Sequence, residues 1–553
     1  MGKKTRMKKE SFMQGIVAIM FSQVIIKILG LVYKLYLTNK EGFGDEGNAI
    51  YSSGFQIYAL LLTLSSIGVP NAISKLVSER LAIGDNKGAH RIFKVAFVTF
   101  ALIGLCGTCL LFFGANYIAN ILLRIPEAEL TLVALSPSIF FVAIASVIRG
   151  YFNGREQMSA SARSQTLEQV FKSLLTIIIV ELVATFSSSN TLLMAAGANL
   201  ATTCATFLGF AYLYLYYKGR RKEVWQDVNS SVNTKNEKIK TIIKKMMLVA
   251  IPISLSSMLS AVNKNIDAFT VVRELETFLT EAEAKVQYGI LGGKVDTLTS
   301  LPLSFNIAFA VALVPAIATA IAKKDIHTAQ KRISYSLLLT MLIGLPCTVG
   351  MFVFAEPILN LLFPNATAGA IVLQISSLTI LFTMLAQTIN GALQGMGKVI
   401  VPIIGLGCGV FIKLILNLVL IPIPEIGVNG AAIGSVVCHI ISFMISFAIL
   451  NKHIKINFSF TKCIIKPIIA TIIMAVCSWF VYINLCNIIP NSIIILGISS
   501  QRMAAILSII TAVIIYIICI IILKIFTKEE VYMLPYGEKL YKIFHKVGIY
   551  KEA

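Results

Sequence analysis

The stretch RGYFNGREQMSASARSQTLEQVFKSLL, residues 149–175, decides the fold because a second stretch repeats its layout. That second stretch, NGALQGMGKVIVPIIGLGCGVFIKLIL at residues 390–416, also begins with Gly-x-x-x-Gly and places a lysine inside an apolar segment. Three pairs of positions recur at an interval of 241: Gly150 and Gly391, Gly154 and Gly395, Lys172 and Lys413. An ordered recurrence of this kind predicts that the chain contains two copies of one helical unit.

Composition places the repeat in a membrane. The 553 residues are 57% hydrophobic and 14% charged, and the mean hydropathy of +0.81 lies outside the range of soluble proteins. Apolar runs of at least about 18 residues recur throughout, and each is long enough to cross a bilayer core of about 30 Å as a helix. The sequence therefore predicts an all-α polytopic membrane protein. Its fourteen expected transmembrane helices cover residues 12–37, 49–73, 95–123, 130–152, 160–186, 191–217, 246–272, 287–321, 333–355, 366–393, 399–423, 428–450, 463–486 and 503–526.

The distribution of basic residues predicts the orientation of these helices. With the N-terminus inside, the inner segments contain 37 of the 48 Lys and Arg residues, whereas the outer loops contain five. Basic inner loops are what the positive-inside rule requires, so both termini are expected in the cytoplasm of a cell-membrane protein. The formal net charge of +21 then needs no nucleic acid as a partner, because anionic lipid of the inner leaflet accounts for it.

Further matches extend the repeat over most of the chain. Residues 66–94 compare with 311–334, where Val-Pro precedes a helix of small residues and then a basic loop, and 195–207 compare with 429–441. Because each copy has six helices, two lobes related by a pseudo-twofold axis along the membrane normal are expected. Two such lobes around a central cavity are typical of a transporter. The expected parts are the N-terminal lobe 1–217, a basic cytoplasmic linker 218–245, the C-terminal lobe 246–450, two extra helices in 451–526, and a cytoplasmic tail 527–553.

Ten charged residues remain within the predicted spans, where an ionisable group costs at least about 2.5 kcal/mol. Glu168 and Lys172 are four residues apart on one helix and are expected to pair. Lys34 and Glu181 are expected to extend to the membrane interface. Structural or coupling charges are the expected role of Glu168, Lys172, Asp267, Asp296 and Lys413.

A substrate site is predicted from the lysines that the first and second copies place at mid-membrane. Lys27 lies near the middle of the first helix, with Gln23 one turn earlier and no acidic residue in that helix. Lys264 and Asn265 occupy the first helix of the second copy, and Lys294 lies on the next. Three lysines in one cavity suit an anionic, phosphate-bearing substrate. No catalytic residue, metal or cofactor is expected, because the cysteines and histidines form no ligand pattern.

Four segments resemble one known group of proteins. They are residues 27–79, beginning KILGLVYKLYLTNKEGFGDEG, residues 149–175, residues 288–318, YGILGGKVDTLTSLPLSFNIAFAVALVPAIA, and residues 390–435. Together they are similar to the polysaccharide-exporter branch of the MATE/MOP flippase superfamily, in particular to its stage V sporulation protein B-like and YtgP-like members, which are related to MurJ-type lipid II flippases. The resemblance extends from about residue 15 to residue 526.

The resemblance implies a fourteen-helix flippase that moves an undecaprenyl-diphosphate-linked saccharide, with lipid II as the best candidate, across the cytoplasmic membrane. A lipid-linked oligosaccharide would be the substrate, and the cell-wall synthesis machinery a partner, in vegetative growth, sporulation or capsule formation. The cationic cavity of MurJ-type proteins agrees in sign with the lysines here, although their arginine pattern in the first helix is replaced by Lys27.

Two other functions are compatible with parts of the sequence. A cation-coupled multidrug antiporter of the same superfamily would need carboxylates to hold its substrate, and Asp267 and Asp296 are the residues that favour it. A membrane-embedded glycosyltransferase would need an acid–base pair in an external loop, and no external loop contains a recognisable one. The flippase interpretation, without enzymatic activity, accounts best for the charges.

Overall fold

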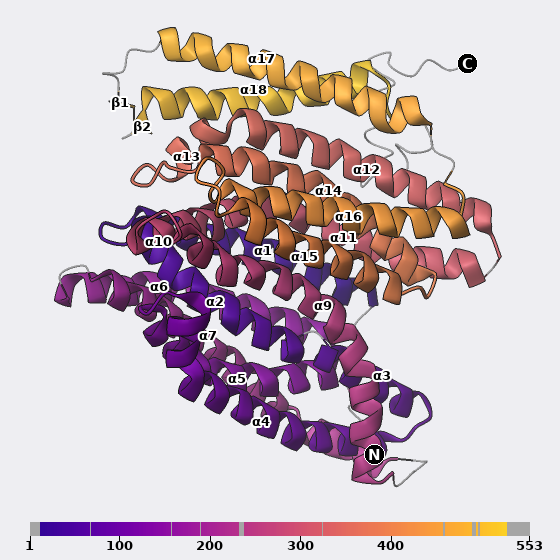
Figure 1. Ribbon diagram of the computed structural model, residues 1–553. Helices are drawn as coiled ribbons and strands as arrows, with labels where there is room; N and C mark the ends of the chain where they lie inside the picture. Colours follow the sequence, from indigo (N-terminus) through magenta and orange to yellow (C-terminus); the bar gives the residue numbers. More distant parts are fainter. Residues whose placement is uncertain are drawn as a thin grey trace. The chain divides into compact units, whose positions relative to one another are not determined.

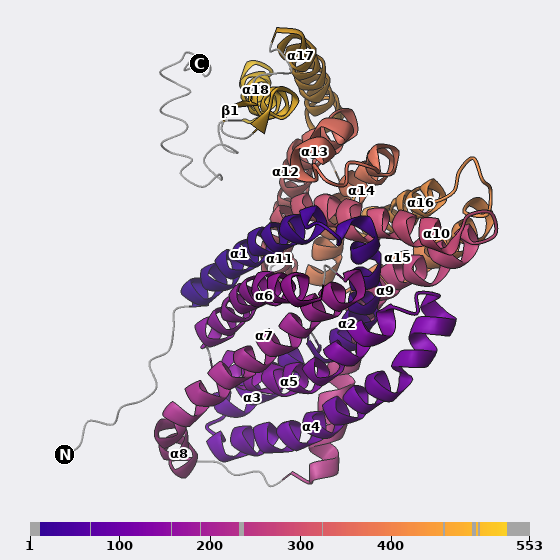
Figure 2. The same ribbon diagram turned by 90° about the vertical axis from the view of Figure 1, so that its left-hand side faces the viewer.

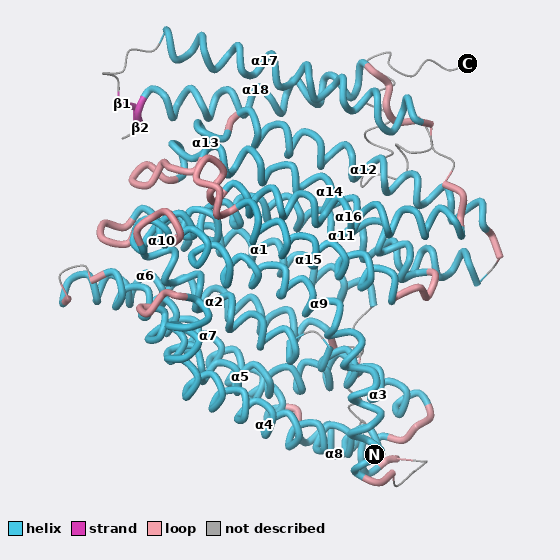
Figure 3. Tube along the Cα trace, in the orientation of Figure 1, coloured by secondary structure: helices cyan, strands magenta, loops and turns pink. Residues whose placement is uncertain are grey.

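The computed structural model describes residues 12–66, 68–155, 157–187, 190–231, 237–322, 324–456, 459–488, 494–495 and 498–527, and it shows a chain built from long helices (Figure 1). Figure 3 shows that loops between the helices of the described part are short. Two strands of two residues each, β1 (Ile494–Ile495) and β2 (Ile498–Ser499), pair in antiparallel fashion. Helices are favoured throughout because a helix satisfies all its backbone hydrogen bonds within one segment, as the apolar interior of a membrane requires.

The all-α polytopic class predicted from the sequence is confirmed. Eleven helical segments of the described residues are long and apolar enough to cross a membrane, by length and composition. Each of the fourteen predicted spans coincides with helical structure. In chain order the helical segments that match the fourteen predicted spans are α1 (Phe12–Asn39), α2 (Gly44–Ser66) with α3 (Gly68–Ala82), α4 (Asn86–Tyr117) with η1 (Ile118–Leu123), α5 (Ala128–Gly154), α6 (Met158–Phe186), α7 (Thr191–Gly219), α9 (Ile239–Leu275), α10 (Glu281–Gly289) with η2 (Ile290–Val295) and α11 (Asp296–Ala322), α12 (Ile326–Val353), α14 (Ala370–Gly395), α15 (Ile400–Leu420), α16 (Asn429–His453), η3 (Thr461–Ile465) with α17 (Lys466–Ile488), and α18 (Ser500–Ile522).

The chain divides into two compact units. Unit 1 comprises Met1–Thr297 and Leu414–Ala431, and unit 2 comprises Leu298–Lys413 and Ala432–Ala553. Unit 1 contains the short helix α8 (Arg221–Asn229), which lies beside the ends of α4 and α7 (Figure 2). Unit 2 contains the short helix α13 (Ala355–Leu362) and the paired helices α17 and α18. The predicted division into lobes at residues 217 and 246 stays a prediction.

In unit 1, the two glycines of the RGYFNG motif let α5 approach α3 closely. A side-chain Cβ at Gly150 would lie 2.8 Å from the carbonyl oxygen of Pro70, and one at Gly154 would lie 2.8 Å from that of Ser74. Real Cβ atoms do not come so near to a backbone oxygen. Glycine is therefore required at both positions, as small residues are wherever helices in membranes pack closely.

In unit 2, the NGALQG motif makes the same contact with the corresponding helix. A Cβ at Gly391 would lie 2.6 Å from the carbonyl oxygen of Ala310, and one at Gly395 would lie 2.7 Å from that of Val314. Here α14 packs on α11, whereas α5 packs on α3 in unit 1, and in both units the two contacted carbonyls are four residues apart. The recurrence in the sequence thus corresponds to one helix–helix contact that is formed twice.

We expect Gly391→Ala to destabilise the protein by about 1–3 kcal/mol, because the added methyl group has to displace the backbone of α11. Gly407→Ala in α15 is the matched control, since a Cβ there meets nothing within 4 Å. That control should be neutral or gain up to about 1 kcal/mol in helix propensity. Thermal unfolding of the purified variants measures both, and equal stability of the two would contradict the close contact.

Candidate functional site in unit 1

Charged side chains of five helical segments gather inside unit 1, and α9 supplies one end of this cluster. Lys264 donates from Nζ to Oδ2 of Asp296 at 3.1 Å, and both side chains remain partly exposed, at 48% and 34%. Its neighbour Asn265 is buried and donates from Nδ2 to the carbonyl oxygen of Gln56 on α2 at 3.2 Å. Asn265 therefore fixes α9 against α2, whereas Lys264 stays accessible.

Lys294 lies at the other end of the cluster in an ion pair that the sequence did not identify. Its side chain is fully buried, and Nζ lies 2.9 Å from Oδ2 of Asp45 in the first turn of α2. The segment η2 has π-helical geometry, which is frequent at functional sites. Gly289 and Gly293, before and within it, leave no room for a Cβ against Asp45 and Asn48. The glycines thus bring the backbone of η2 against α2, so that Lys294 reaches Asp45.

Lys294 and Asp296, which are two residues apart, pair with different residues, Asp45 and Lys264. A third acid, Asp267 on α9, accepts a hydrogen bond at 3.0 Å from Nδ2 of Asn417 at the end of α15, and that amide also donates to Thr270 at 2.9 Å. Each of the three aspartates in this cluster therefore accepts a hydrogen bond from a side chain of another helical segment.

Lys27 is exposed on α1 and lies close enough to Lys264 for their charges to repel each other. Within the described residues it forms no ion pair. Gln23, one turn earlier, belongs to α1, but its side chain lies outside the described part of the structure. The predicted role of Lys27 and Lys264 in binding stays a prediction.

Two lysines of the cluster lie on aromatic rings. Lys34 is 5% exposed, with Nζ 4.5 Å from the centre of the Tyr51 ring, so the expectation that it extends to the membrane interface is wrong. Lys172 is 7% exposed, with Nζ 4.2 Å from the centre of the Phe55 ring and 5.2 Å from that of Tyr33. Both lysines are held by the electron-rich faces of rings on α1 and α2.

The predicted pair of Glu168 and Lys172 is also wrong. Glu168 accepts a hydrogen bond at 2.8 Å from Nη2 of Arg149, which donates to Ser164 as well. Arg149 belongs to the RGYFNG motif at the end of α5, and its planar guanidinium suits a carboxylate better than an ammonium does. Glu168 therefore ties α5 to α6. Glu181, by contrast, is 48% exposed and pairs with Lys40 at 2.6 Å, as expected for a residue near the interface.

Lys413, the sequence counterpart of Lys172, is 1% exposed and belongs to unit 2. The cluster in unit 1 contains five lysines and three aspartates, so the lysines exceed the aspartates by two when all are ionised. Its lysines are Lys27, Lys34, Lys172, Lys264 and Lys294, and its aspartates are Asp45, Asp267 and Asp296.

The sequence alone did not identify Asp45 and Lys34 as site residues, and each has a physical reason. Asp45 lies in the acidic run KEGFGDEG, which resembles an outer loop, yet it occupies the first turn of α2. Lys34 lies near the end of an apolar helix, where lysine usually extends to the surface. The signal for Lys34 was its spacing of seven residues from Lys27, which places both on one face of α1.

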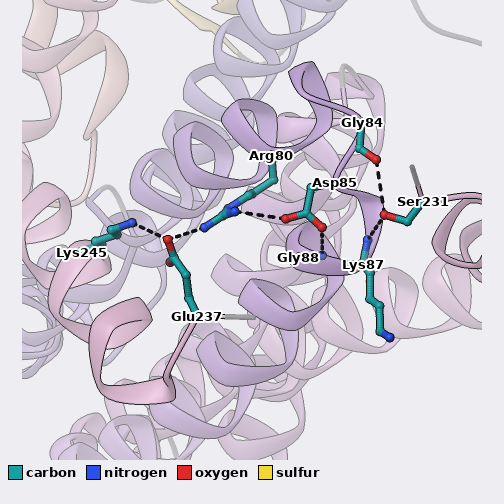
Figure 4. A network of polar contacts seen from close by, with 8 residues as sticks. All are labelled: Arg80, Gly84, Asp85, Lys87, Gly88, Ser231, Glu237 and Lys245. Carbon is teal, nitrogen blue, oxygen red and sulfur yellow. Dashed lines mark hydrogen bonds and ion pairs between the residues drawn. The ribbon is translucent and has the colours of Figure 1, made fainter. Parts of the chain in front are cut away.

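A second polar network ties the basic linker to the other helices of unit 1 (Figure 4). Oε1 of Glu237 lies 2.5 Å from Nη2 of Arg80 at the end of α3 and 2.6 Å from Nζ of Lys245 on α9. Arg80 also pairs with Asp85, which caps α4 by accepting from the backbone of Gly88. One carboxylate thus joins α3 to the start of α9.

The linker is docked by further contacts. Val224 and Val228 of α8 are buried in the apolar core formed by α3, α4, α5 and α9. Asp227 pairs with Arg155 at 2.9 Å, and Ser231 accepts from the backbone of Lys87 and donates to the carbonyl of Gly84 (Figure 4). The linker helix of unit 1 is therefore an integral part of the packed structure.

Comparison with known proteins supports this description of the fold. The family model described as polysaccharide biosynthesis protein matches residues 12–321, more than half of the chain, and the MatE model matches residues 293–419. Among curated proteins of Bacillus subtilis (strain 168), membrane protein YabM is 29% identical over 98% of both chains. Stage V sporulation protein B is 25% identical, covering 96% of this chain and 98% of its own. Lipid II flippase MurJ is 24% identical, with 84% and 86% covered.

Two solved structures show the same architecture at low identity. Lipid II flippase MurJ in an inward closed conformation has a TM-score of 0.67 and 16% identity, covering 92% of this chain and 98% of that one. A multidrug resistance MATE family transporter of the MOP superfamily, facing inward, has a TM-score of 0.63 and 16% identity, with 81% and 98% covered. The expected superfamily is confirmed.

The ion pair of Lys294 with Asp45 should behave as a buried pair. We expect Lys294→Met to destabilise the protein by about 3 kcal/mol, because it leaves the Asp45 carboxylate without its ammonium. The double variant Lys294→Met with Asp45→Asn should recover part of this loss. Lys264→Met is the control, since its pair with Asp296 is partly exposed and contributes about 1 kcal/mol or less. Additive losses in unfolding measurements of the double variant would show that the two residues are not coupled.

The Glu237 contact should make stability depend on pH. The hydrogen bond from Lys245, together with that from Arg80, lowers the pKa of Glu237 below its ordinary value. A lowered pKa in the folded protein means that the contact stabilises above the ordinary pKa of about 4.3 and is lost as pH falls through the folded value. Glu237→Gln should therefore cost about 1 kcal/mol at pH 7, and its difference from wild type should shrink as pH falls below about 4.3 and vanish once the pH lies below the folded value.

The control for this measurement is Glu223→Gln on α8, a carboxylate without an ion pair among the described residues. Thermal unfolding of both variants across pH 3–8 tests the contact. A difference between Glu237→Gln and wild type that persists unchanged at low pH would assign the loss to packing rather than to the ion pairs.

Proposed function

Because the chain belongs to the family of polysaccharide biosynthesis proteins, we propose that it moves an undecaprenyl-diphosphate-linked saccharide, with lipid II as the best candidate, from the inner to the outer leaflet of the cytoplasmic membrane. Its relatives are transporters and flippases of the MOP superfamily. The proposal concerns the substrate and the direction of transport. Alternating access of two lobes is the expected mechanism.

The excess of lysine in the cluster of unit 1 is the observation that carries the proposal. Five ammonium groups face three carboxylates, and each of the carboxylates already receives a hydrogen bond. Charges in a membrane protein interior are costly unless paired, so two additional negative charges would be favourable there. A diphosphate ester carries about two negative charges near neutral pH, which matches the excess of two.

Lys264 and Lys27 are the residues best placed to meet such a group. Both side chains are accessible, and an anion between them would relieve their mutual repulsion. An ammonium donates up to three hydrogen bonds and tolerates rotation of its partner, which suits a phosphate that has to be bound and then released. Asn265 and Lys294 would act on the site by fixing α9 and η2 against α2.

The names of the relatives agree with this assignment. One relative is a lipid II flippase and another a stage V sporulation protein, which suggests cell-wall precursor transport in growth or in sporulation. We further propose that both termini face the cytoplasm, as the distribution of basic residues predicts. A multidrug antiporter, the alternative that Asp267 and Asp296 favoured, fits less well because both acids already accept hydrogen bonds from neighbouring groups.

Complementation of a strain depleted of its lipid II flippase tests the proposal. We expect Lys27→Ala and Lys264→Ala to reduce rescue, with flipping of lipid II in proteoliposomes at least about tenfold slower, because each removes a charge-assisted contact worth about 1.5–3 kcal/mol. Lys87→Ala, an exposed lysine whose side chain lies away from the cluster, should rescue fully. Full rescue by both cluster variants would contradict the lysine site, and ethidium efflux without lipid II flipping would favour the antiporter.

A further inference from the structure

Lys34 and Lys172 are two buried lysines that lie close together where α1, α2 and α6 pack against one another. Their side chains are 5% and 7% exposed, and each Nζ lies over an aromatic ring of α2. Those two rings, Tyr51 and Phe55, are stacked with their centres 5.9 Å apart and an angle of 9° between their planes. Two ammonium groups thus rest on one continuous aromatic surface, close enough for their charges to repel each other.

Neither lysine has a carboxylate partner among the described residues. Lys34 donates a long hydrogen bond of 3.4 Å to Oγ of Ser52, and Lys172 contacts two aromatic rings in the part of the chain that the structure describes. The acid one turn before Lys172, Glu168, is bound to Arg149. The acids that act on Lys34 at longer range are Asp45 and Asp296, and each is already paired with another lysine.

Aromatic faces alone are a weak substitute for an anion. A ring attracts a cation through its quadrupole, and this attraction falls well short of the cost of holding two like charges together away from water. Hydroxyl groups are available at the same place, because Tyr33 and Tyr51 lie with their phenolic oxygens 3.3 Å apart beside the lysines. Two ammonium groups and nearby hydroxyls provide donors that a phosphate group would accept.

The donors around Lys34 and Lys172 lie at a different height along α1 from Lys27, so together they define a path for an anion. Lys34 follows Lys27 by seven residues on one face of α1, a rise of about 10 Å along the helix. Lys172, near the middle of α6, approaches from the neighbouring helix. The chain therefore presents anion-binding groups at two successive heights along α1, first Lys27 with Lys264 and then Lys34 with Lys172.

We propose that Lys34 and Lys172 form a second phosphate-binding subsite, which receives a phosphate group after it leaves Lys27 and Lys264. As a step in transport this rests on the proposed function, whereas anion binding at the subsite does not. The aromatic surface positions the two ammonium groups, and Tyr33 and Tyr51 complete the donor set. Lys172 would thus be a substrate-binding residue rather than the partner of Glu168.

Binding of inorganic pyrophosphate to the full-length protein in nanodiscs tests the subsite directly. Titration calorimetry should give two equivalents per chain for wild type and one for the double variant Lys34→Met with Lys172→Met. Lys172→Arg should retain the second equivalent, since it keeps the charge. Lys466→Met on α17 is the matched control, because this lysine also lies within a membrane helix and donates to the carbonyl oxygen of Leu523 at 2.7 Å. It should bind two equivalents.

Lipid II flipping by the same preparations separates the subsite from the proposed function. We expect the double variant to flip at least tenfold more slowly than wild type while it elutes and unfolds as wild type does. A double variant that still binds two equivalents would overturn the subsite, and one that binds one equivalent but flips at the wild-type rate would overturn its role in transport. A wild type that binds two equivalents but flips no lipid II would overturn the proposed substrate and leave the subsite standing.

Discussion

The cost of an unpaired charge away from water governs the interior of unit 1. A helix can satisfy its own backbone in a membrane, but a lysine on that helix has no such internal solution. Lys294 resolves this by reaching Asp45 on α2, and Lys264 by reaching Asp296. The first pair joins segments far apart in the chain, so the packing of α2 with η2 depends on it, and the second pair joins α9 to α11. Lys34 and Lys172 are left to aromatic rings.

Close helix contacts make these pairs possible, and glycine makes the contacts possible. In both units a glycine pair packs one helix onto the carbonyl oxygens of another, through Gly150 and Gly154 on α5 and Gly391 and Gly395 on α14. Gly289 and Gly293 bring η2 onto α2 in the same manner. Without side chains between them, backbones approach closely enough for a buried ammonium to find its carboxylate. The buried ion pairs therefore depend on the glycines that let the helices approach.

The sign of the remaining charge connects these charged groups to transport. A protein that only needed stability would pair each buried lysine or replace it by an apolar residue, because an unpaired buried charge is strongly destabilising. The cluster in unit 1 instead holds five lysines and three aspartates. Such an excess of like charge is costly, and under the proposed function the phosphate groups of the substrate would relieve it.

The sequence by itself determined the helical membrane class, the repeated glycine motif and the set of intramembrane charges, because hydropathy and spacing act locally along the chain. The tertiary structure alone decided which partners these charges have. Glu168 binds Arg149 instead of Lys172, and Lys34 is buried instead of extended, because guanidinium geometry and the aromatic surface of α2 become available only once α1, α2, α5 and α6 are packed. Pairing depends on distances between helices, which no spacing along one helix contains.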